Sequence, residues 1–258
     1  MSSVSMSRFS PDSPLVARVH PSPNHGERQG VPRPDMILLH YTGMESTEAA
    51  LARLCDPVAA VSCHYLVFES GEVVQLVPEI RRAWHAGVSI WQGETDINSH
   101  SIGIEIANPG HDFGYPDFPD TQIEAVTALC RDITARCSIR PERVLAHSDV
   151  APDRKRDPGE KFPWRRLHES GVGLWIEPLA ISAGPSLAPG DQGPAVQELQ
   201  AALAEFGYGI DATGLYDERT LCVVTAFQRH FRPERVDGVA DRSTIASLHA
   251  LLTARTTA

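Results

Sequence analysis

Two histidines and an aspartate have the residue types of a hydrolytic zinc site. Such a site takes about three imidazole or carboxylate ligands and keeps one position open for water. His40 closes the apolar run MILLHY, His147 follows the apolar run VLA, and Asp157 precedes the pair Pro158-Gly159. A zinc ion held there would lower the pKa of its water to about 7 and polarise a substrate carbonyl. Structural histidines and an ordinary Asp-Pro-Gly turn give the same local sequence, so these alternatives remain open at this point.

Two further charged residues could complete this chemistry. In SIGIEIAN, isoleucines alternate with small residues, so Glu105 is the lone carboxylate on the other face of the strand and could act as a general base. Lys155, two residues before Asp157, could stabilise an oxyanion. The alternatives are a structural ion pair for Glu105 and a solvated loop position for Lys155. The remaining charges of this loop are expected to be solvated or paired locally: Asp149, Asp153, Arg154 and Arg156.

The elements that must position these residues can be predicted from hydrophobic periodicity. The continuous apolar run 36–41 predicts a buried strand, and HYLVFESGEVVQLV predicts two strands joined by a hairpin at 69–72. STEAALARLC predicts a short helix. Thr121 and Glu124 fit a capping box ahead of an amphipathic helix. The fold class is therefore predicted to be α/β (α+β), with a mixed central β-sheet flanked by helices.

A second domain is predicted after a linker rich in proline, glycine, serine and alanine. The predicted boundaries are an extended N-terminal segment at 1–34, a catalytic domain at 35–176, a linker at 177–194 and a helical domain at 195–254. In the helical domain GLYDERT and GVADRST share the pattern Gly-x-x-Asp-x-x-Thr. Each copy places a turn glycine before an aspartate suited to N-cap a helix. A small three-helix all-α domain is expected.

Composition excludes several classes of partner. A net charge of -10 disfavours nucleic acid and anionic membrane surfaces, because both would repel the chain. No apolar run is long enough for a transmembrane segment, and the first residues lack the apolar core of a secretory signal. The five cysteines form no CxxC pair and are expected to be free thiols. We therefore expect a cytoplasmic location, with the periplasm or cell envelope as the alternative.

Four fragments together resemble a known enzyme family. LLHYTG, VSCHYLVFESGEVVQLVPEIRRAWHAGVS, SIGIEIAN and AHSDVAPDRKRDPGE are similar, in this order, to the zinc-dependent N-acetylmuramoyl-L-alanine amidases of the AmpD and AmiD type. That family is related to phage amidases and to peptidoglycan recognition proteins. The resemblance covers roughly residues 35–168.

The resemblance implies a site and a reaction. It implies that one Zn²⁺ per chain is held by His40, His147 and Asp157, that Glu105 is the catalytic acid and base, and that Lys155 stabilises the tetrahedral intermediate. The implied reaction is hydrolysis of the amide between N-acetylmuramic acid, or its 1,6-anhydro form, and L-alanine of the stem peptide. It further implies that five residues border the substrate cleft: His64, Tyr65, Trp84, His85 and Ala86. For His64 and Trp84, a structural role inside the domain is the alternative.

The C-terminal part resembles the three-helix peptidoglycan-binding domain found in many wall hydrolases. The implied partner is peptidoglycan or an anhydro-muropeptide, and a helical packing domain without a ligand is the alternative. For the whole chain, the alternative function is a recognition protein that binds muropeptides without cutting them. The presence of all three ligand candidates together with Glu105 and Lys155 favours the enzyme.

Overall fold

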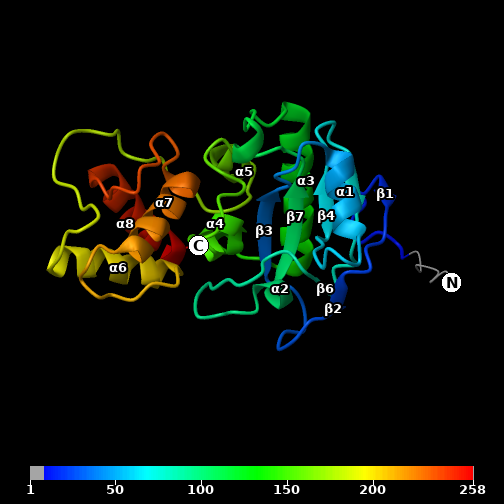
Figure 1. Cartoon of the computed structure of the whole chain (residues 1–258), viewed down its shortest axis with the longest axis horizontal. Helices are drawn as coiled ribbons and strands as arrows, with labels where there is room; N and C mark the ends of the chain where they lie inside the picture. Colours follow the sequence, from blue (N-terminus) through cyan, green and yellow to red (C-terminus); the bar gives the residue numbers. More distant parts are fainter. Residues whose placement is uncertain (1–8, 258) are drawn as a thin grey trace. The chain divides into compact units, whose positions relative to one another are not determined.

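The computed structural model describes residues 9–257, so the first eight residues of the predicted N-terminal segment lie outside the described part. The chain forms two compact units (Figure 1). The first comprises Met1–Gly87 and Ile97–Val144, and the second comprises Val88–Asp96 and Leu145–Ala258. Residues 145–176 thus belong to the same unit as the C-terminal helices, whereas the sequence analysis placed a boundary at 177–194.

The structure contains a mixed six-stranded sheet flanked by helices, and this confirms the predicted fold class. Its strand order is β1-β5-β4-β7-β3-β8. β3 and β4 pair with β7 in parallel, and β4 pairs with β5 in the antiparallel sense as the predicted hairpin. The strands are β1 (Arg18–Val19), β3 (Met36–Tyr41), β4 (Tyr65–Val67), β5 (Val73–Gln75), β7 (Ser101–Ile106) and β8 (Val144–Ala146). A separate antiparallel pair joins β2 (His25–Glu27) to β6 (Arg81–Ala83).

Helices pack on this sheet and explain its apolar strands. Four successive residues of β3, from Met36 to Leu39, are fully buried, as expected for a strand covered on both faces. α1 (Thr47–Cys55) begins after the N-cap Ser46 and buries Leu54 against the sheet. α3 (Asp120–Cys137) runs beside β4 and β7 in Figure 1. The shorter helices of this unit are α2 (Ile97–His100) and two 3-10 turns, His111–Phe113 and Pro141–Arg143.

The predicted capping box at Thr121 is wrong. α3 begins at Asp120 after the N-cap Pro119, and no side chain caps it. Because the helix starts one residue earlier than the box requires, Thr121 already lies inside its first turn. Its hydroxyl instead donates to the carbonyl of Glu69 in the β4–β5 hairpin, 3.2 Å away. Asp120 places a negative charge at the positive end of the helix dipole.

The second unit contains the predicted three helices and two short ones. Both copies of the Gly-x-x-Asp-x-x-Thr pattern act as N-caps: Asp217 accepts from the Thr220 N–H at 2.9 Å, and Asp241 accepts from the Thr244 N–H at 2.8 Å. The caps that the sequence predicts are confirmed. The helices are α4 (His147–Val150), α5 (Trp164–Glu169), α6 (Pro194–Phe206), α7 (Glu218–Phe231) and α8 (Arg242–Thr257).

A buried glutamine extends each copy of this repeat. Gln200 accepts from the backbone N–H of the turn glycine Gly214 at 2.8 Å, and its amide donates to a threonine hydroxyl of the same cap. In the second copy, the side-chain oxygen of Gln228 accepts from the backbone N–H of Gly238 at 2.8 Å. The positive φ of both glycines, 78° and 70°, explains why the turns need this residue type. The repeat is therefore a helix, a turn and a capped second helix clamped by one amide.

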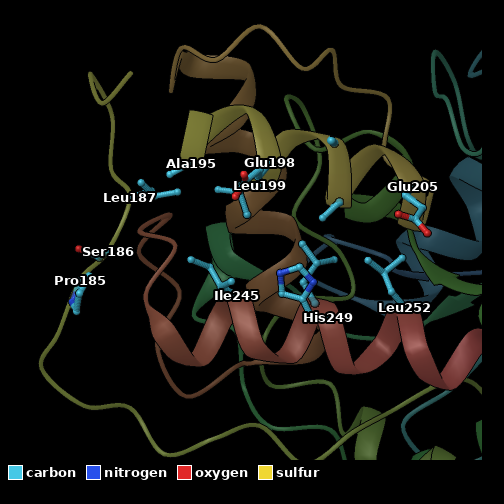
Figure 2. Close-up of a pocket in the computed structure, with 13 residues that line it drawn as sticks. Pro185, Ser186, Leu187, Ala195, Glu198, Leu199, Glu205, Ile245, His249 and Leu252 are labelled. Carbon is cyan, nitrogen blue, oxygen red and sulfur yellow. The ribbon is translucent and has the colours of Figure 1, made fainter. Parts of the chain in front are cut away.

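An apolar pocket of about 580 Å³ opens between α6 and α8, with residues 185–187 along one wall (Figure 2). Its lining is mainly leucine, isoleucine and alanine, and the polar side chains on it include Glu198, Glu205 and His249. Among the helices that the structure describes, none is long and apolar enough to cross a lipid bilayer.

Candidate metal and catalytic site

The three predicted metal ligands lie together. One potential ligand atom from each of His40, His147 and Asp157 falls within 4.8 Å of the other two, and all three side chains are buried. Nδ1 of His147 is 2.9 Å from Oδ2 of Asp157. Within residues 9–257 this is the one group of three or more histidine, cysteine or acidic side chains arranged in this way. Two imidazoles and one carboxylate match the ligands of catalytic zinc, so the residues fit this ion.

The irregular loop 151–159 brings Asp157 to His147 by closing on the short helix α4. His147 is the first residue of α4, directly after β8. The Ser148 N–H donates to the Asp157 carbonyl at 3.0 Å, which joins the two ends of the loop. The Asp157–Pro158 peptide bond is cis, and Gly159 has a φ of 85° that a side chain would disfavour. The Ser148–Asp157 backbone hydrogen bond thus holds His147 and Asp157 close together, although they lie ten residues apart in the chain.

Strand register places Glu105 beside His40, one of the predicted ligands. The two residues are direct partners in the parallel pairing of β3 with β7. Paired residues of neighbouring strands project to the same face, with backbones about 4.8 Å apart. Glu105 is half-buried. The Glu105 carboxylate therefore lies on the same face of the sheet as the side chain of His40.

Lys155 lies in the loop between α4 and Asp157 and is half-buried. Its backbone N–H donates to the carbonyl of Ala151 at 3.0 Å, so the loop turns back on α4 at this residue. The preceding Arg154 donates from its guanidinium Nε to the carbonyl of Val88 at 2.8 Å. Hydrogen bonds thus hold both Arg154 and Lys155 to other residues of the second unit. That Lys155 stabilises the oxyanion stays a prediction.

His85 contacts the predicted ligand His40. Its Nδ1 is 3.0 Å from Nε2 of His40, and its Nε2 is 3.3 Å from the Ser101 hydroxyl. The loop is held by Asn98, whose carbonyl oxygen accepts from the N–H groups of His85 and Ala86, both at 2.9 Å. A Cβ on Gly103 would lie 2.5 Å from the His85 ring, so only glycine leaves room for it. Ala86 is fully buried.

His64 and Tyr65 are both fully buried. Nδ1 of His64 accepts from the Gly103 N–H at 2.9 Å and its Nε2–H donates to the Arg81 carbonyl at 3.0 Å, while burial lowers its pKa to about 3. The Tyr65 hydroxyl donates to Glu79 at 2.6 Å, and burial raises its pKa. Interior hydrogen bonds account for both residues. Trp84 is half-buried, and its backbone N–H donates to Ser62.

Asp149 lies in an environment that the sequence did not predict. It was expected to be solvated or paired locally, yet it is fully buried. Its carboxylate accepts from the Tyr208 hydroxyl at 2.7 Å and from Nδ1 of His230 at 2.6 Å. These partners lie 59 and 81 residues away along the chain, so no local pattern could reveal them.

Comparison with known proteins supplies the family context. Residues 30–160 match the N-acetylmuramoyl-L-alanine amidase family, and residues 192–248 match a putative peptidoglycan binding domain. N-acetylmuramoyl-L-alanine amidase AmiD of Escherichia coli K12 is 40% identical over 238 residues, which cover 86% of this chain and 83% of AmiD. 1,6-anhydro-N-acetylmuramyl-L-alanine amidase AmpD of Enterobacter cloacae is 36% identical over 169 residues, or 59% of this chain and 88% of AmpD.

A solved structure matches over most of the chain. It is E. coli AmiD in complex with the substrate anhydro-N-acetylmuramic acid-L-Ala-D-γ-Glu-L-Lys. The TM-score is 0.74 at 36% sequence identity, and the match covers 90% of this chain and 98% of the AmiD chain.

Proposed function

Because the chain belongs to the N-acetylmuramoyl-L-alanine amidase family, we propose that it hydrolyses the amide between the lactyl group of N-acetylmuramic acid and L-alanine with one Zn²⁺ held by His40, His147 and Asp157. The observation that carries the metal assignment is the buried cluster of these three side chains. A fourth protein ligand would close a structural site, whereas three leave a position open for chemistry. The cluster therefore supports hydrolysis.

Residues of the chain itself carry out the proton transfers and the charge stabilisation. Zinc, when bound, supplies Lewis-acid polarisation of the amide carbonyl and acidifies the attacking water. Glu105, beside His40 in the sheet, accepts a proton from that water and returns it to the departing amide nitrogen. Lys155 places a positive charge near the oxygen that becomes negative during attack. His40 and His147 serve only as ligands, and the proton transfers are left to Glu105.

The substrate is peptidoglycan or its anhydro-muropeptide fragments. The AmiD structure that matches 90% of this chain holds an anhydro-N-acetylmuramic acid peptide, and AmpD is named for the same 1,6-anhydro sugar. The family reaction forms a free stem peptide and a free muramic acid carboxyl group from one amide and one water. The products are therefore separable from the substrate by mass.

The test is direct. The purified full-length chain is incubated with anhydro-N-acetylmuramyl tripeptide, and released tripeptide is measured by mass spectrometry beside the zinc content of the protein. We expect release by the zinc-loaded chain, loss of release after chelation and recovery on adding zinc. Binding of the muropeptide without release would identify a recognition protein instead. Release that chelation leaves unchanged would overturn the metal assignment.

We further propose that the helices of the second unit attach the chain to intact peptidoglycan through the pocket between α6 and α8. The match to a putative peptidoglycan binding domain covers the α6 side of this pocket and, on α8, Ile245 and Leu248. Ala201 lines the pocket, whereas Ala204 is an exposed residue of the same helix outside the lining. We expect Ala201→Arg to reduce sedimentation with isolated sacculi and Ala204→Arg to leave it unchanged. Equal sedimentation of both variants and the wild type would exclude the pocket as the contact.

For the compartment we propose the cytoplasm. All five cysteines are free thiols, and burial raises the pKa of Cys63 and Cys130, which keeps them protonated and unreactive. Free thiols are typical of a reducing compartment. Cell fractionation with detection of the native chain is the measurement, and recovery in the periplasmic fraction would contradict the proposal.

A further inference from the structure

Asp149 joins the metal-binding segment to the C-terminal helices inside the second unit. It lies two residues after His147 and has no exposed surface. Oδ2 accepts from the backbone N–H of Ala146 at 2.8 Å and from Nδ1–H of His230 in α7 at 2.6 Å. Oδ1 accepts from the hydroxyl of Tyr208, just after α6, at 2.7 Å. A buried carboxylate is tolerated only where such donors surround it, so these contacts determine where the residue lies.

Packing fixes the two distant donors. The His230 ring is stacked between Trp164, with ring centroids 3.7 Å apart, and Phe231, also at 3.7 Å, and the side chain is almost fully buried. Tyr208 packs edge to face on Trp91 at 5.0 Å. Burial and the neighbouring Asp149 raise the pKa of Tyr208, so its phenol keeps the proton that it donates. Ring packing therefore restricts the orientation of both donors.

The short helix α4, which carries Asp149, needs tertiary contacts to be stable. α4 has four residues, and helices shorter than about 12 residues are marginal in water without tertiary contacts. Two further ion pairs connect α7 to the segment that follows α4. Arg219 lies 3.5 Å from Asp153, which is largely exposed, and Arg229 lies 3.8 Å from Glu160, which is partly exposed. Ion pairs that water reaches contribute little. The Asp149 contacts are the buried ones.

We infer that Tyr208 and His230 are positioning residues of the metal site, because they anchor Asp149 and so fix α4, whose first residue is the ligand His147. This inference rests on the proposed zinc function. It gives the helices that match a wall-binding domain a second task within the enzyme. Without either donor the buried carboxylate loses a partner, α4 shifts to recover one, and His147 leaves its place beside Asp157.

The experiment compares variants of the zinc-loaded full-length chain. Tyr208→Phe removes only the hydroxyl, and His230→Asn keeps a donor near the Nδ1 position whereas His230→Phe keeps the ring stack without a donor. The matched control is Tyr216→Phe, since Tyr216 is equally buried and donates to the Gly238 carbonyl at 2.6 Å, within the helical repeat. The readouts are the zinc dissociation constant, by competition with a chromophoric chelator, and the thermal midpoint. Amide exchange at Ala146 and Ser148 gives a third readout.

We expect Tyr208→Phe and His230→Phe to weaken zinc binding by about 10- to 100-fold, the usual range for groups that orient a ligand. His230→Asn should recover part of this loss, and the Ala146 and Ser148 amides should exchange faster in the two variants that lack a donor. Tyr216→Phe should lower the thermal midpoint without changing zinc affinity. Wild-type affinity in Tyr208→Phe and His230→Phe would overturn the inference, as would an equal loss in Tyr216→Phe. A wild-type chain that binds no zinc would overturn the proposed metal site itself.

Discussion

His40 and Glu105 lie side by side on adjacent parallel strands. His40 is near the end of β3, and Glu105 is its register partner in β7. The proposed ligand His40 and the proposed proton carrier Glu105 are therefore both positioned by the backbone hydrogen bonds between β3 and β7. This arrangement separates two roles that single substitutions can distinguish.

Replacing Glu105 by Gln should leave zinc bound and reduce the rate. The amide keeps the size of the side chain but cannot accept the proton of the attacking water, and general acid and base groups typically contribute about 10²- to 10⁴-fold. Stem peptide release and zinc content are measured on the same sample. Glu124→Gln, on the exposed side of α3, is the control for loss of one negative charge. Full activity in Glu105→Gln would remove the residue from the mechanism.

Replacing Asp157 by Ala should lower zinc occupancy, because one of three ligands is lost from a buried cluster. Asp153, an exposed aspartate of the same loop, gives a matched control, and we expect Asp153→Ala to bind zinc as the wild type does. Metal analysis after gel filtration measures both. Unchanged stoichiometry in Asp157→Ala would exclude it from the ligand set.

Replacing Lys155 by Met should reduce the rate by about 10²- to 10³-fold while zinc affinity changes little, since the ammonium is proposed to act on the substrate oxygen. Methionine keeps the length of the aliphatic stem. The measurement is the hydrolysis rate at saturating muropeptide. A pure loss of zinc would show that Lys155 supports the metal loop instead.

Replacing Gly103 by Ala should disturb the site through His85. The new Cβ would lie 2.5 Å from the His85 ring, so the ring must move and its contact with His40 is lost. We expect weaker zinc binding, by the same chelator competition. Gly184→Ala is the control, because nothing lies within 4 Å of its Cβ and its φ is ordinary. Equal zinc affinity in both variants would mean that His85 is dispensable for His40.

The N-cap of α7 predicts an acid-sensitive contribution to stability. Hydrogen bonds from the backbone N–H and hydroxyl of Thr220 lower the pKa of Asp217 below its ordinary value of 3.8. A group whose pKa is lowered by folding stabilises the fold above its unfolded pKa, and this contribution is lost as pH falls through the folded pKa. Asp217→Ala should cost about 1 kcal/mol at neutral pH. The cost should shrink as the pH falls below 3.8 and through the lowered pKa of the folded state. Urea unfolding across this range measures it.

Asp211, an exposed aspartate in the loop before α7, is the control for that measurement. Asp211→Ala should leave the free energy of unfolding within about 0.5 kcal/mol of the wild type. A pH-independent loss in Asp217→Ala would show that the side chain stabilises α7 without its charge.

Local patterns predicted the elements that carry the site but not the contacts that hold them. The apolar run ending at His40, the hairpin after Tyr65 and both aspartate caps follow from periodicity and turn chemistry, and the structure confirms them. Spacing alone left the metal ligands undecided among other roles, because a histidine and an aspartate ten residues apart on a loop match no helical or strand period. Asp149 was misjudged because a buried carboxylate and an exposed one look alike until its distant donors are known.

The buried side chains of Gln200 and Gln228 stabilise the turns of the C-terminal helical repeat. Even so, another helical domain could not simply replace this repeat. Consider a hybrid chain in which the residues after 194 are replaced by another helical domain. Asp149 would then be buried without its hydrogen-bond donors Tyr208 and His230. Such grafting succeeds only if the incoming module brings two donors to the same place, or if Asp149 is made neutral at the same time. Asp149 therefore connects the metal-binding segment to the C-terminal helices by buried hydrogen bonds, in addition to the covalent linker.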